Sequence, residues 1–338
     1  MVPTSLAPSA TCDQSPNAAA NSNALNRWFI ISLSPFIPPI SDVSLHREVA
    51  ADDVRKPTCV YNVDALINGQ YCRGFTLHPG TTGKITMELD TVEYEKTDGI
   101  AYVRLNRPDK LNAMNAQMHD ELGRVWEDFR DDPAMRVAIL SGNGRCFSAG
   151  ADLSGGAPTD YRYTGEFPDI TQTRNVFKPI IAAMHSHVVG YGLWIALDTD
   201  IRIAADDVSF WLPEPQWGIA TIPAAWFPKI MPWAIASELL LLAERIDAQR
   251  AYQVGLVNKV VAPDQLMAEA ERVANRICEL SPMAVQGMKE SMVRAATLDY
   301  NAVDQITDWI QTRVMTSEDR KEGAKAFLEK RRVEWPGK

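Results

Sequence analysis

The chain is poor in cysteine and has no long apolar run. Its five cysteines are Cys12, Cys59, Cys72, Cys146 and Cys278. None forms a C-x-x-C pair, so this odd, widely spaced set predicts neither a disulfide framework nor a zinc site. It favours a reducing, cytoplasmic setting. No apolar run approaches the roughly 20 residues that cross a bilayer, so we expect no membrane partner.

The chain also lacks an excess of positive charge and the common nucleotide-binding motifs. Its formal net charge is −9. A general nucleic-acid binder gains affinity by neutralising phosphates, so this charge argues against a nucleic-acid partner. A local basic patch for one phosphorylated ligand is still compatible with it. No G-x-G-x-x-G or G-x-x-x-x-G-K-[ST] sequence follows an expected strand, which argues against a nucleotide-binding doubly wound sheet.

Composition changes near residue 86. Residues 1–86 hold eight of the 21 prolines and are rich in Asn, Ser and Ala. We expect residues 1 to about 55 to be irregular or disordered, and a hairpin over residues 58–78 around the Asn68-Gly69 turn signal. Two interpretations stay open: residues 1–86 are a genuine extension, or they are read from an upstream start codon and have no function.

From Met87 onward the pattern indicates an α/β domain. We expect an active-site core over residues 87–265 and a helical C-terminal region over residues 266–338. Asn115 is a plausible N-cap for a helix from 116 to about 130 with one apolar stripe. The predicted strands are Val92–Tyr94, Ile100–Leu105, Val137–Leu140, Ile180–Met184, Ile201–Ala204 and Val208–Phe210. The later predicted helices cover residues 192–198, 234–244, 248–254, 264–279, 282–297 and 301–316.

Two small-residue loops carry the strongest functional signal. Gly144–Asp152 follows the apolar run Val137–Leu140, and Val189–Gly192 follows Pro179–Ala183. Loops of small residues let a ligand approach backbone N–H groups closely. Two such loops can aim two N–H donors at one oxygen, which is an oxyanion hole. The pair therefore predicts an enzyme that stabilises an enolate or a tetrahedral oxyanion.

Residues 87–338 resemble the enoyl-CoA hydratase/isomerase (crotonase) family through an ordered series of sequence blocks. The blocks are Leu105–Ala113, Ser141–Leu153, Pro179–Ala183, Asp200–Ala204, Pro213–Glu214, Gly255–Val261 and Asp319–Arg331. The resemblance implies a ββα spiral with a helical C-terminal trimerisation region, and hence a homotrimer or a dimer of trimers. It also implies an acyl-CoA substrate, with coenzyme A present as part of that substrate and no further cofactor.

The resemblance assigns roles to three catalytic positions. The N–H groups of Ala151 and Tyr191 would bind the thioester oxygen, with Tyr191 in place of the family's usual glycine. Glu214 falls on the acid/base position. A carboxylate at the edge of an apolar pocket can have a raised pKa, which suits proton transfer near neutral pH.

The chain departs from the family pattern at two places. Trp194 stands where hydratases of the family carry a second glutamate, and Ile219–Pro228 lacks their glycine-rich turn. Because tryptophan cannot split a water as a carboxylate pair does, two-glutamate hydration is not expected. Double-bond isomerisation and single-glutamate hydration or dehydration remain, together with hydratase-lyase action on an aromatic acyl-CoA. The rival from another class is a catalytically idle scaffold with this fold.

Substrate-binding positions follow from the same resemblance. We expect contacts with coenzyme A from Lys110, Leu111, Arg145, Ala149, Phe327 and Lys330, the last two from the same or a neighbouring subunit. Trp194 and Trp217 either line a flat acyl pocket or fill the core. Tyr161, Arg162 and Tyr163 in the loop 154–176 are further candidates. His185 and His187 would lie on one face of a strand, where packing is a better explanation than metal binding.

Overall fold

The computed structural model describes residues 87–155, 175–220, 227–296, 298 and 300–338. The chain divides into two units, Met1–Thr81 and Thr82–Lys338, and all described residues belong to the second. The hairpin predicted at 58–78 lies outside the described residues. So does most of the loop 154–176, including Tyr161, Arg162 and Tyr163.

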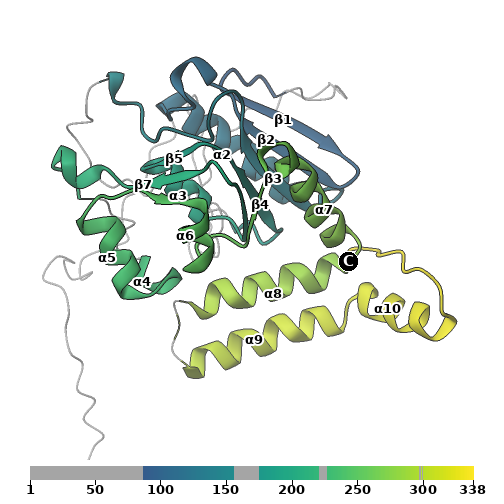
Figure 1. The fold of residues 1–338 in the computed structure, drawn as a ribbon. Helices are drawn as coiled ribbons and strands as arrows, with labels where there is room; N and C mark the ends of the chain where they lie inside the picture. Colours follow the sequence, from purple (N-terminus) through teal and green to yellow (C-terminus); the bar gives the residue numbers. More distant parts are fainter. Residues whose placement is uncertain (1–86, 156–174, 221–226, 297, 299) are drawn as a thin grey trace, which may run out of the picture. The chain divides into compact units, whose positions relative to one another are not determined.

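The core contains a six-stranded sheet whose order follows the chain (Figure 1). The first two strands form an antiparallel hairpin, and each later strand pairs in parallel with the one before it. β3 and β4 are buried along nearly their whole length, as expected for parallel strands that are covered on both faces. The strands are β1 (Val92–Thr97), β2 (Ile100–Leu105), β3 (Val137–Gly142), β4 (Ile180–Met184), β6 (Ile201–Ala205) and β9 (Lys259–Val261).

A second, three-stranded sheet brings distant parts of the chain together. It contains β5 (His187–Val189), β7 (Ser209–Trp211) and β8 (Ile246–Asp247). β5 and β7 are parallel, with Val189 opposite Trp211. Both strands therefore end at the same edge, where helix α3 (Tyr191–Leu197) follows β5 and a 3-10 turn, η3 (Glu214–Trp217), follows β7. This edge places the Tyr191 and Glu214 segments side by side.

The predicted helix after residue 115 is confirmed as α2 (Ala116–Asp131). The Asn115 side chain accepts a hydrogen bond from the Met118 backbone N–H at 3.0 Å, which caps the helix start. Asp247 caps α6 (Ala248–Gln253) in the same way, through Arg250 N–H at 2.7 Å. The buried stripe of α2 contains Met118, Leu122, Val125, Trp126 and Phe129.

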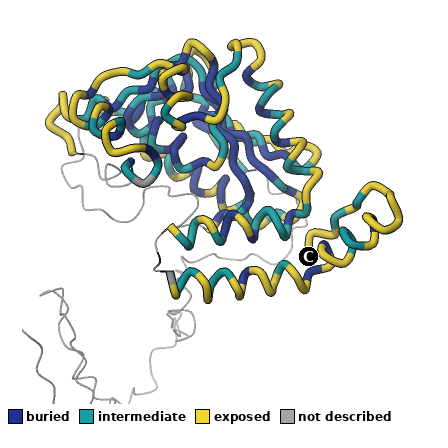
Figure 2. The backbone as a smooth tube through the Cα atoms, turned by 60° about the horizontal axis from the view of Figure 1, so that its bottom comes forward, coloured by how far each residue is buried: buried dark blue, intermediate teal, exposed yellow. Residues whose placement is uncertain are grey.

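The C-terminal third is helical, as the sequence predicts. Helix α7 (Leu266–Cys278) packs on the six-stranded sheet, against β3, β4 and β6. The hairpin of α8 (Pro282–Ala295) and α9 (Tyr300–Met315) then leaves the core, with α10 (Glu318–Glu329) at its end (Figures 1 and 2). Helices α4 (Phe227–Ile230) and α5 (Trp233–Leu241) lie beside the second sheet. This architecture is the expected α/β spiral with a helical C-terminal region.

An ion pair between a buried lysine and a more exposed aspartate connects the C-terminal helices to the core. Lys289 of α8 donates to the Asp200 carboxylate at 2.7 Å and to the Lys178 carbonyl at 3.0 Å. The same Asp200 carboxylate accepts from the Ile180 N–H at 2.7 Å, at the start of β4. Lys289 is only 7% exposed, so this pair fixes α8 against the strand that leads to the second sheet.

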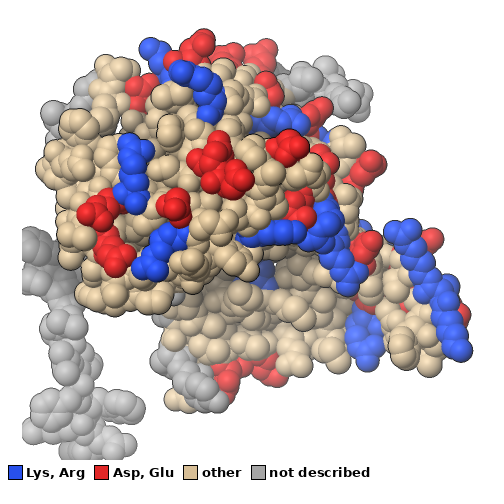
Figure 3. Space-filling view, viewed as in Figure 1, with Lys and Arg blue, Asp and Glu red and all other residues tan. Residues whose placement is uncertain are grey.

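Several helices expose large apolar side chains in the single chain. They are Trp233 and Leu241 of α5, Leu242 just after it, Met288 and Met292 of α8, Trp309 of α9, and Phe327 and Leu328 of α10. In Figure 2 the outer faces of α9 and α10 are largely exposed, and Figure 3 shows charges of both signs spread over the core. None of the described helices combines the length and apolar character that a bilayer crossing requires.

The expectation that His185 and His187 share one face of a strand is wrong. β4 ends at Met184, and Ser186 has a φ of 56°, which breaks the extended backbone between the two histidines. His187 instead begins β5, a strand that the sequence analysis did not predict.

Candidate active site

The two small-residue loops lie against each other at the end of β5. The Ser148 N–H donates to the His187 carbonyl, and the Val189 N–H donates back to the Ser148 carbonyl, both at 3.0 Å. Gly192 packs on the same serine, since a Cβ there would lie 2.7 Å from the Ser148 Cβ. The predicted partnership of the loops is therefore confirmed as a direct backbone contact.

Gly150 allows the closest approach between the loops. It has a φ of 95°, and a Cβ at this position would lie 2.8 Å from the Val189 carbonyl oxygen and 3.5 Å from the Tyr191 amide nitrogen. The first distance is too short for any real side chain, so only glycine fits. The contact places the amide of Ala151, next in the chain, close to that of Tyr191.

The Ala151 amide points away from the segment that pairs with it, and Tyr191 begins a helix. Met114 pairs in parallel with Ala151: its N–H donates to the Gly150 carbonyl at 2.8 Å, and its carbonyl accepts from Asp152 N–H at 2.9 Å. This pattern uses the residues on either side of Ala151, so the Ala151 N–H points away from Met114. Tyr191 is the first residue of α3, where backbone N–H groups have no intrahelical acceptor.

A charged clamp holds the Ala151 segment in place. Arg107 donates to the Asp152 carboxylate at 2.9 Å and also to the Ala113 carbonyl. Hydrogen bonds from the Ser154 hydroxyl and N–H, with that of Arg107, lower the pKa of Asp152 to about 2. Asp152 is therefore an ionised anchor for this segment. The role of Arg107 was not predicted from the sequence.

Glu214 lies against Gly190, the residue before Tyr191. A Cβ on Gly190 would be 2.9 Å from Glu214 Oε1. The Gly190 N–H donates to the Trp211 carbonyl at 2.8 Å, which locks this segment onto the end of β7. Glu214 Oε2 is buried and has no hydrogen-bond partner among the described residues. Burial raises the pKa of Glu214, which is the environment of a group that exchanges protons near neutral pH.

The site thus has the parts of an acyl-transfer or enolate-forming centre. It brings together two candidate backbone donors, Ala151 and Tyr191, and a carboxylate with a raised pKa, Glu214. A family sequence model described as enoyl-CoA hydratase/isomerase matches residues 95–338.

The chain belongs to the enoyl-CoA hydratase/isomerase family. A carnitinyl-CoA dehydratase of Proteus mirabilis is 39% identical over 245 residues, covering 69% of this chain and 94% of the relative. A carnitinyl-CoA dehydratase of Escherichia coli is 35% identical over 263 residues, covering 74% and 99%. The chain is accordingly an enzyme of the hydratase/isomerase type.

Solved structures agree with this assignment. An enoyl-CoA hydratase of Mycobacterium tuberculosis superposes with a TM-score of 0.69 at 32% identity, over 73% of this chain and 99% of that chain. An enoyl-CoA hydratase of Bacillus anthracis gives a TM-score of 0.67 at 29% identity, over 74% and 100%. Residues 1–86 lie outside the family match.

Four of the predicted coenzyme A contacts lie together where the Lys110–Asn112 segment meets the Gly144–Asp152 loop. The Ala149 N–H donates to the Leu111 carbonyl at 2.9 Å. The Asn112 side chain donates to the carbonyls of Asn143 and Cys146, on either side of Arg145. Lys110 and Arg145 are both exposed at this junction. Asn112 was missed in the sequence analysis, although it lies in the first family block and is fully buried.

The remaining predicted contacts are not brought to Glu214 within one chain. Phe327 is 82% exposed on α10, and Lys330 is exposed just after this helix. Figure 1 shows α10 on the opposite side of the core from β5 and β7. Trp217 follows Glu214 in η3 but is 63% exposed, so it is not a core residue in the single chain.

Trp194 is half-buried on α3, one turn after Tyr191. Its indole Nε1 is buried and has no hydrogen-bond partner among the described residues. The indole of Trp211, in contrast, donates to the Ala243 carbonyl at 2.8 Å.

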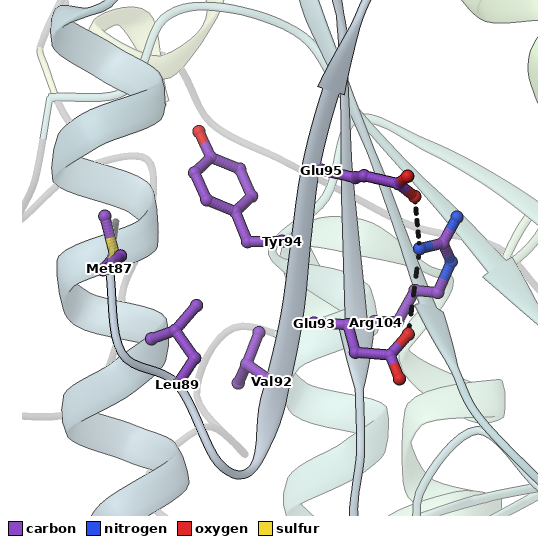
Figure 4. A pocket seen from close by; sticks show the side chains of 7 residues that line it. All are labelled: Met87, Leu89, Val92, Glu93, Tyr94, Glu95 and Arg104. Carbon is purple, nitrogen blue, oxygen red and sulfur yellow. Dashed lines mark hydrogen bonds and ion pairs between the residues drawn. The ribbon is translucent and has the colours of Figure 1, made fainter. Parts of the chain in front are cut away.

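A separate pocket lies at the outer edge of the six-stranded sheet (Figure 4). Its carboxylates already face a cation, because Arg104 lies 2.9 Å from Glu95 and 3.8 Å from Glu93. The pocket therefore offers no acid/base group comparable to Glu214. Its other lining residues are Met87, Leu89, Val92 and Tyr94.

Proposed function

We propose that this enzyme interconverts a 3-hydroxyacyl-CoA and the corresponding enoyl-CoA, with Glu214 as its single acid/base. The names of its relatives, carnitinyl-CoA dehydratase and enoyl-CoA hydratase, support hydration or dehydration of a coenzyme A thioester. The observation that carries the proposal is the packing of Gly150 near the Tyr191 amide and of Gly190 against Glu214.

The thioester carbonyl oxygen accepts hydrogen bonds from the N–H groups of Ala151 and Tyr191. Negative charge develops on this oxygen when a proton leaves Cα, so the two donors bind the enolate more tightly than the substrate. Removing one such donor typically costs a hundredfold or more in rate, on the order of 3 kcal/mol. The Arg107–Asp152 clamp keeps the Ala151 donor in position.

Glu214 performs the proton transfers. In the dehydration direction its carboxylate takes the Cα proton, and the enolate then expels the Cβ hydroxyl group. The protonated Glu214 delivers the same proton to the departing oxygen, so water leaves and the double bond forms between Cα and Cβ. Hydration is the reverse. A raised pKa suits a group that is base and acid in one cycle.

The coenzyme A part extends past Lys110, Leu111, Arg145 and Ala149, which surround the oxyanion loop. Phe327 and Lys330 act in a neighbouring subunit of a homotrimer, or of a dimer of trimers. The exposed apolar side chains of α5, α8, α9 and α10 support such an assembly.

A panel of thioesters analysed by product mass tests the proposal. The panel holds crotonyl-CoA, 3-hydroxybutyryl-CoA, carnitinyl-CoA, 3-enoyl-CoAs and aromatic enoyl-CoAs. We expect a gain or loss of 18 mass units, from water, with at least one 2-enoyl- or 3-hydroxyacyl-CoA. Products of unchanged mass would establish isomerisation instead, and release of acetyl-CoA would establish a lyase. Absence of both turnover and binding would favour an idle scaffold.

A further inference from the structure

We propose that the indole N–H of Trp194 is a specificity-determining donor that, together with Glu214, selects acyl groups with a hydroxyl group at Cβ. This proposal rests on the proposed function of the site. It concerns two buried polar atoms without partners among the described residues, Trp194 Nε1 and Glu214 Oε2.

The two residues flank the same glycine. Glu214 Oε1 lies 2.9 Å from the position that a Cβ of Gly190 would take. The backbone N–H of Trp194 donates to the Gly190 carbonyl at 3.1 Å, so Trp194 lies one helical turn beyond Gly190. Side chains on a helix lean toward its N-terminus and cover the residue four positions earlier. The indole of Trp194 therefore leans toward the Gly190 end of the helix, the end against which the Glu214 carboxylate lies.

The other residues of α3 support this orientation. Gly192, Leu193, Ile195, Ala196 and Leu197 are buried. Tyr191, Trp194 and Asp198 are half-buried and follow one another at helical spacing, so they form one stripe. This stripe begins at the candidate oxyanion donor. Trp194 thus belongs to the face of α3 that carries the site, and not to the face that packs in the core.

A buried indole N–H without a partner is unusual, because it loses its hydrogen bond to water and gains none in return. Trp211 shows the ordinary arrangement, with its N–H bonded to the Ala243 carbonyl. The Trp194 N–H can only donate, and an ionised Glu214 can only accept.

A hydroxyl group satisfies both atoms at once. Its oxygen accepts from the Trp194 N–H, and its hydrogen is donated to Glu214 Oε2. A 3-hydroxyacyl group carries such a hydroxyl at the carbon that loses it in dehydration, next to the carbon that Glu214 deprotonates. An acyl group without a hydroxyl group at Cβ, such as butyryl, leaves Trp194 Nε1 and Glu214 Oε2 without hydrogen-bond partners. Trp194 therefore raises affinity for the hydroxylated thioester without taking part in proton transfer.

Binding of matched thioesters to Trp194→Phe tests the assignment, since phenylalanine keeps an aromatic face but lacks the N–H. Dissociation constants of 3-hydroxybutyryl-CoA and butyryl-CoA are measured by calorimetry under conditions without turnover, in the Glu214→Gln background. We expect Trp194→Phe to weaken the hydroxylated ligand about tenfold, the value of one hydrogen bond, and butyryl-CoA less than about twofold. Equal weakening of both ligands, or no change in either, overturns the inference.

Two further measurements distinguish a loss of ligand selectivity from a loss of folding: the unfolding temperatures of the variants, and the indole NMR signals of the wild-type chain. Trp194→Phe should unfold at the wild-type temperature or above it, because it removes an unpartnered donor. Trp211→Phe should unfold earlier, because it loses the bond to the Ala243 carbonyl, and should keep the wild-type preference for the hydroxylated thioester. In the wild-type chain with ¹⁵N-labelled indoles, one indole signal should shift with 3-hydroxybutyryl-CoA and not with butyryl-CoA. Identical shifts with both ligands contradict the proposal even if the variant does not fold. Failure of the wild-type chain to bind either thioester contradicts the proposed function itself.

Discussion

The carboxylate of Glu214 rests on the backbone of Gly190, where a Cβ would come within 2.9 Å of Oε1. Gly190 also has a φ of 51° and begins the segment that leads to the Tyr191 amide. One glycine therefore sets the spacing between the proposed acid/base and one of the proposed oxyanion donors.

Gly190→Ala should reduce turnover by about a hundredfold or more, because the new methyl group displaces the Glu214 carboxylate. Gly255→Ala is the matched control: Gly255 also has a positive φ, 78°, but a Cβ there meets nothing within 4 Å. Both variants carry backbone strain of about 1 kcal/mol, and steady-state kinetics compares their activities. Equal turnover in the two would show that the contact with Glu214 has no catalytic role.

The raised pKa of Glu214 predicts a distinctive dependence of stability on pH. Because burial favours the protonated carboxyl, the folded chain binds this proton more tightly than the unfolded chain. As pH rises above the ordinary value of 4.5, ionisation therefore lowers the free energy of unfolding. Glu214→Gln removes this loss, so its stability relative to the wild type should increase from pH 4.5 upward and then level off. Urea unfolding across this range measures it; a difference independent of pH would contradict the buried environment.

Asp152→Asn should weaken both the fold and the Ala151 donor. The Arg107 and Asp152 side chains are 16% and 12% exposed, so loss of the charge leaves Arg107 poorly solvated. We expect a loss of about 2 kcal/mol in unfolding free energy and about tenfold in turnover. The stabilisation is present above the ordinary pKa of 3.8, so the deficit should shrink as the wild-type carboxyl protonates toward pH 2. The control is Glu279→Gln, which breaks an exposed ion pair with Arg276. It should change the unfolding free energy by no more than about 0.5 kcal/mol and leave turnover at the wild-type rate.

Lys289→Met should loosen the C-terminal helices. It leaves the Asp200 carboxylate without its cation and the Lys178 carbonyl without its donor. We expect a loss of about 2 kcal/mol and faster hydrogen exchange in α8 and α9, with β2 and β3 unchanged. Lys321→Met removes an exposed pair with Glu318 and should leave exchange at the wild-type rate. Uniform exchange changes over the whole domain would argue against a local anchoring role.

Local signals predicted much of the fold. The N-cap Asn115 and the apolar stripe of the following helix placed α2 to within a residue, and the predicted strand Ile100–Leu105 is found with the same bounds as β2. The two glycine loops were correctly paired because small residues have few reasons to cluster behind buried strands. These features depend on neighbours in sequence, which periodicity and capping describe well.

Features that depend on distant partners escaped prediction. β5 has only three residues and is defined by its pairing with β7, so no period could reveal it. The anchoring roles of Arg107 and Asn112 depend on carbonyl groups that only the folded loops bring near. Likewise, the sequence gives no sign that Gly190 contacts the Glu214 carboxylate, because this contact joins the ends of β5 and β7, which are distant in the chain.

The central claim is that Glu214 moves the proton while the backbone amides of Ala151 and Tyr191 hold the thioester oxygen. Turnover of Glu214→Gln, measured beside its affinity for the same acyl-CoA, tests this most directly. The variant keeps the size of the side chain and leaves both amides in place, so we predict loss of turnover by about a thousandfold or more with binding essentially unchanged. Turnover close to the wild-type rate would contradict the account.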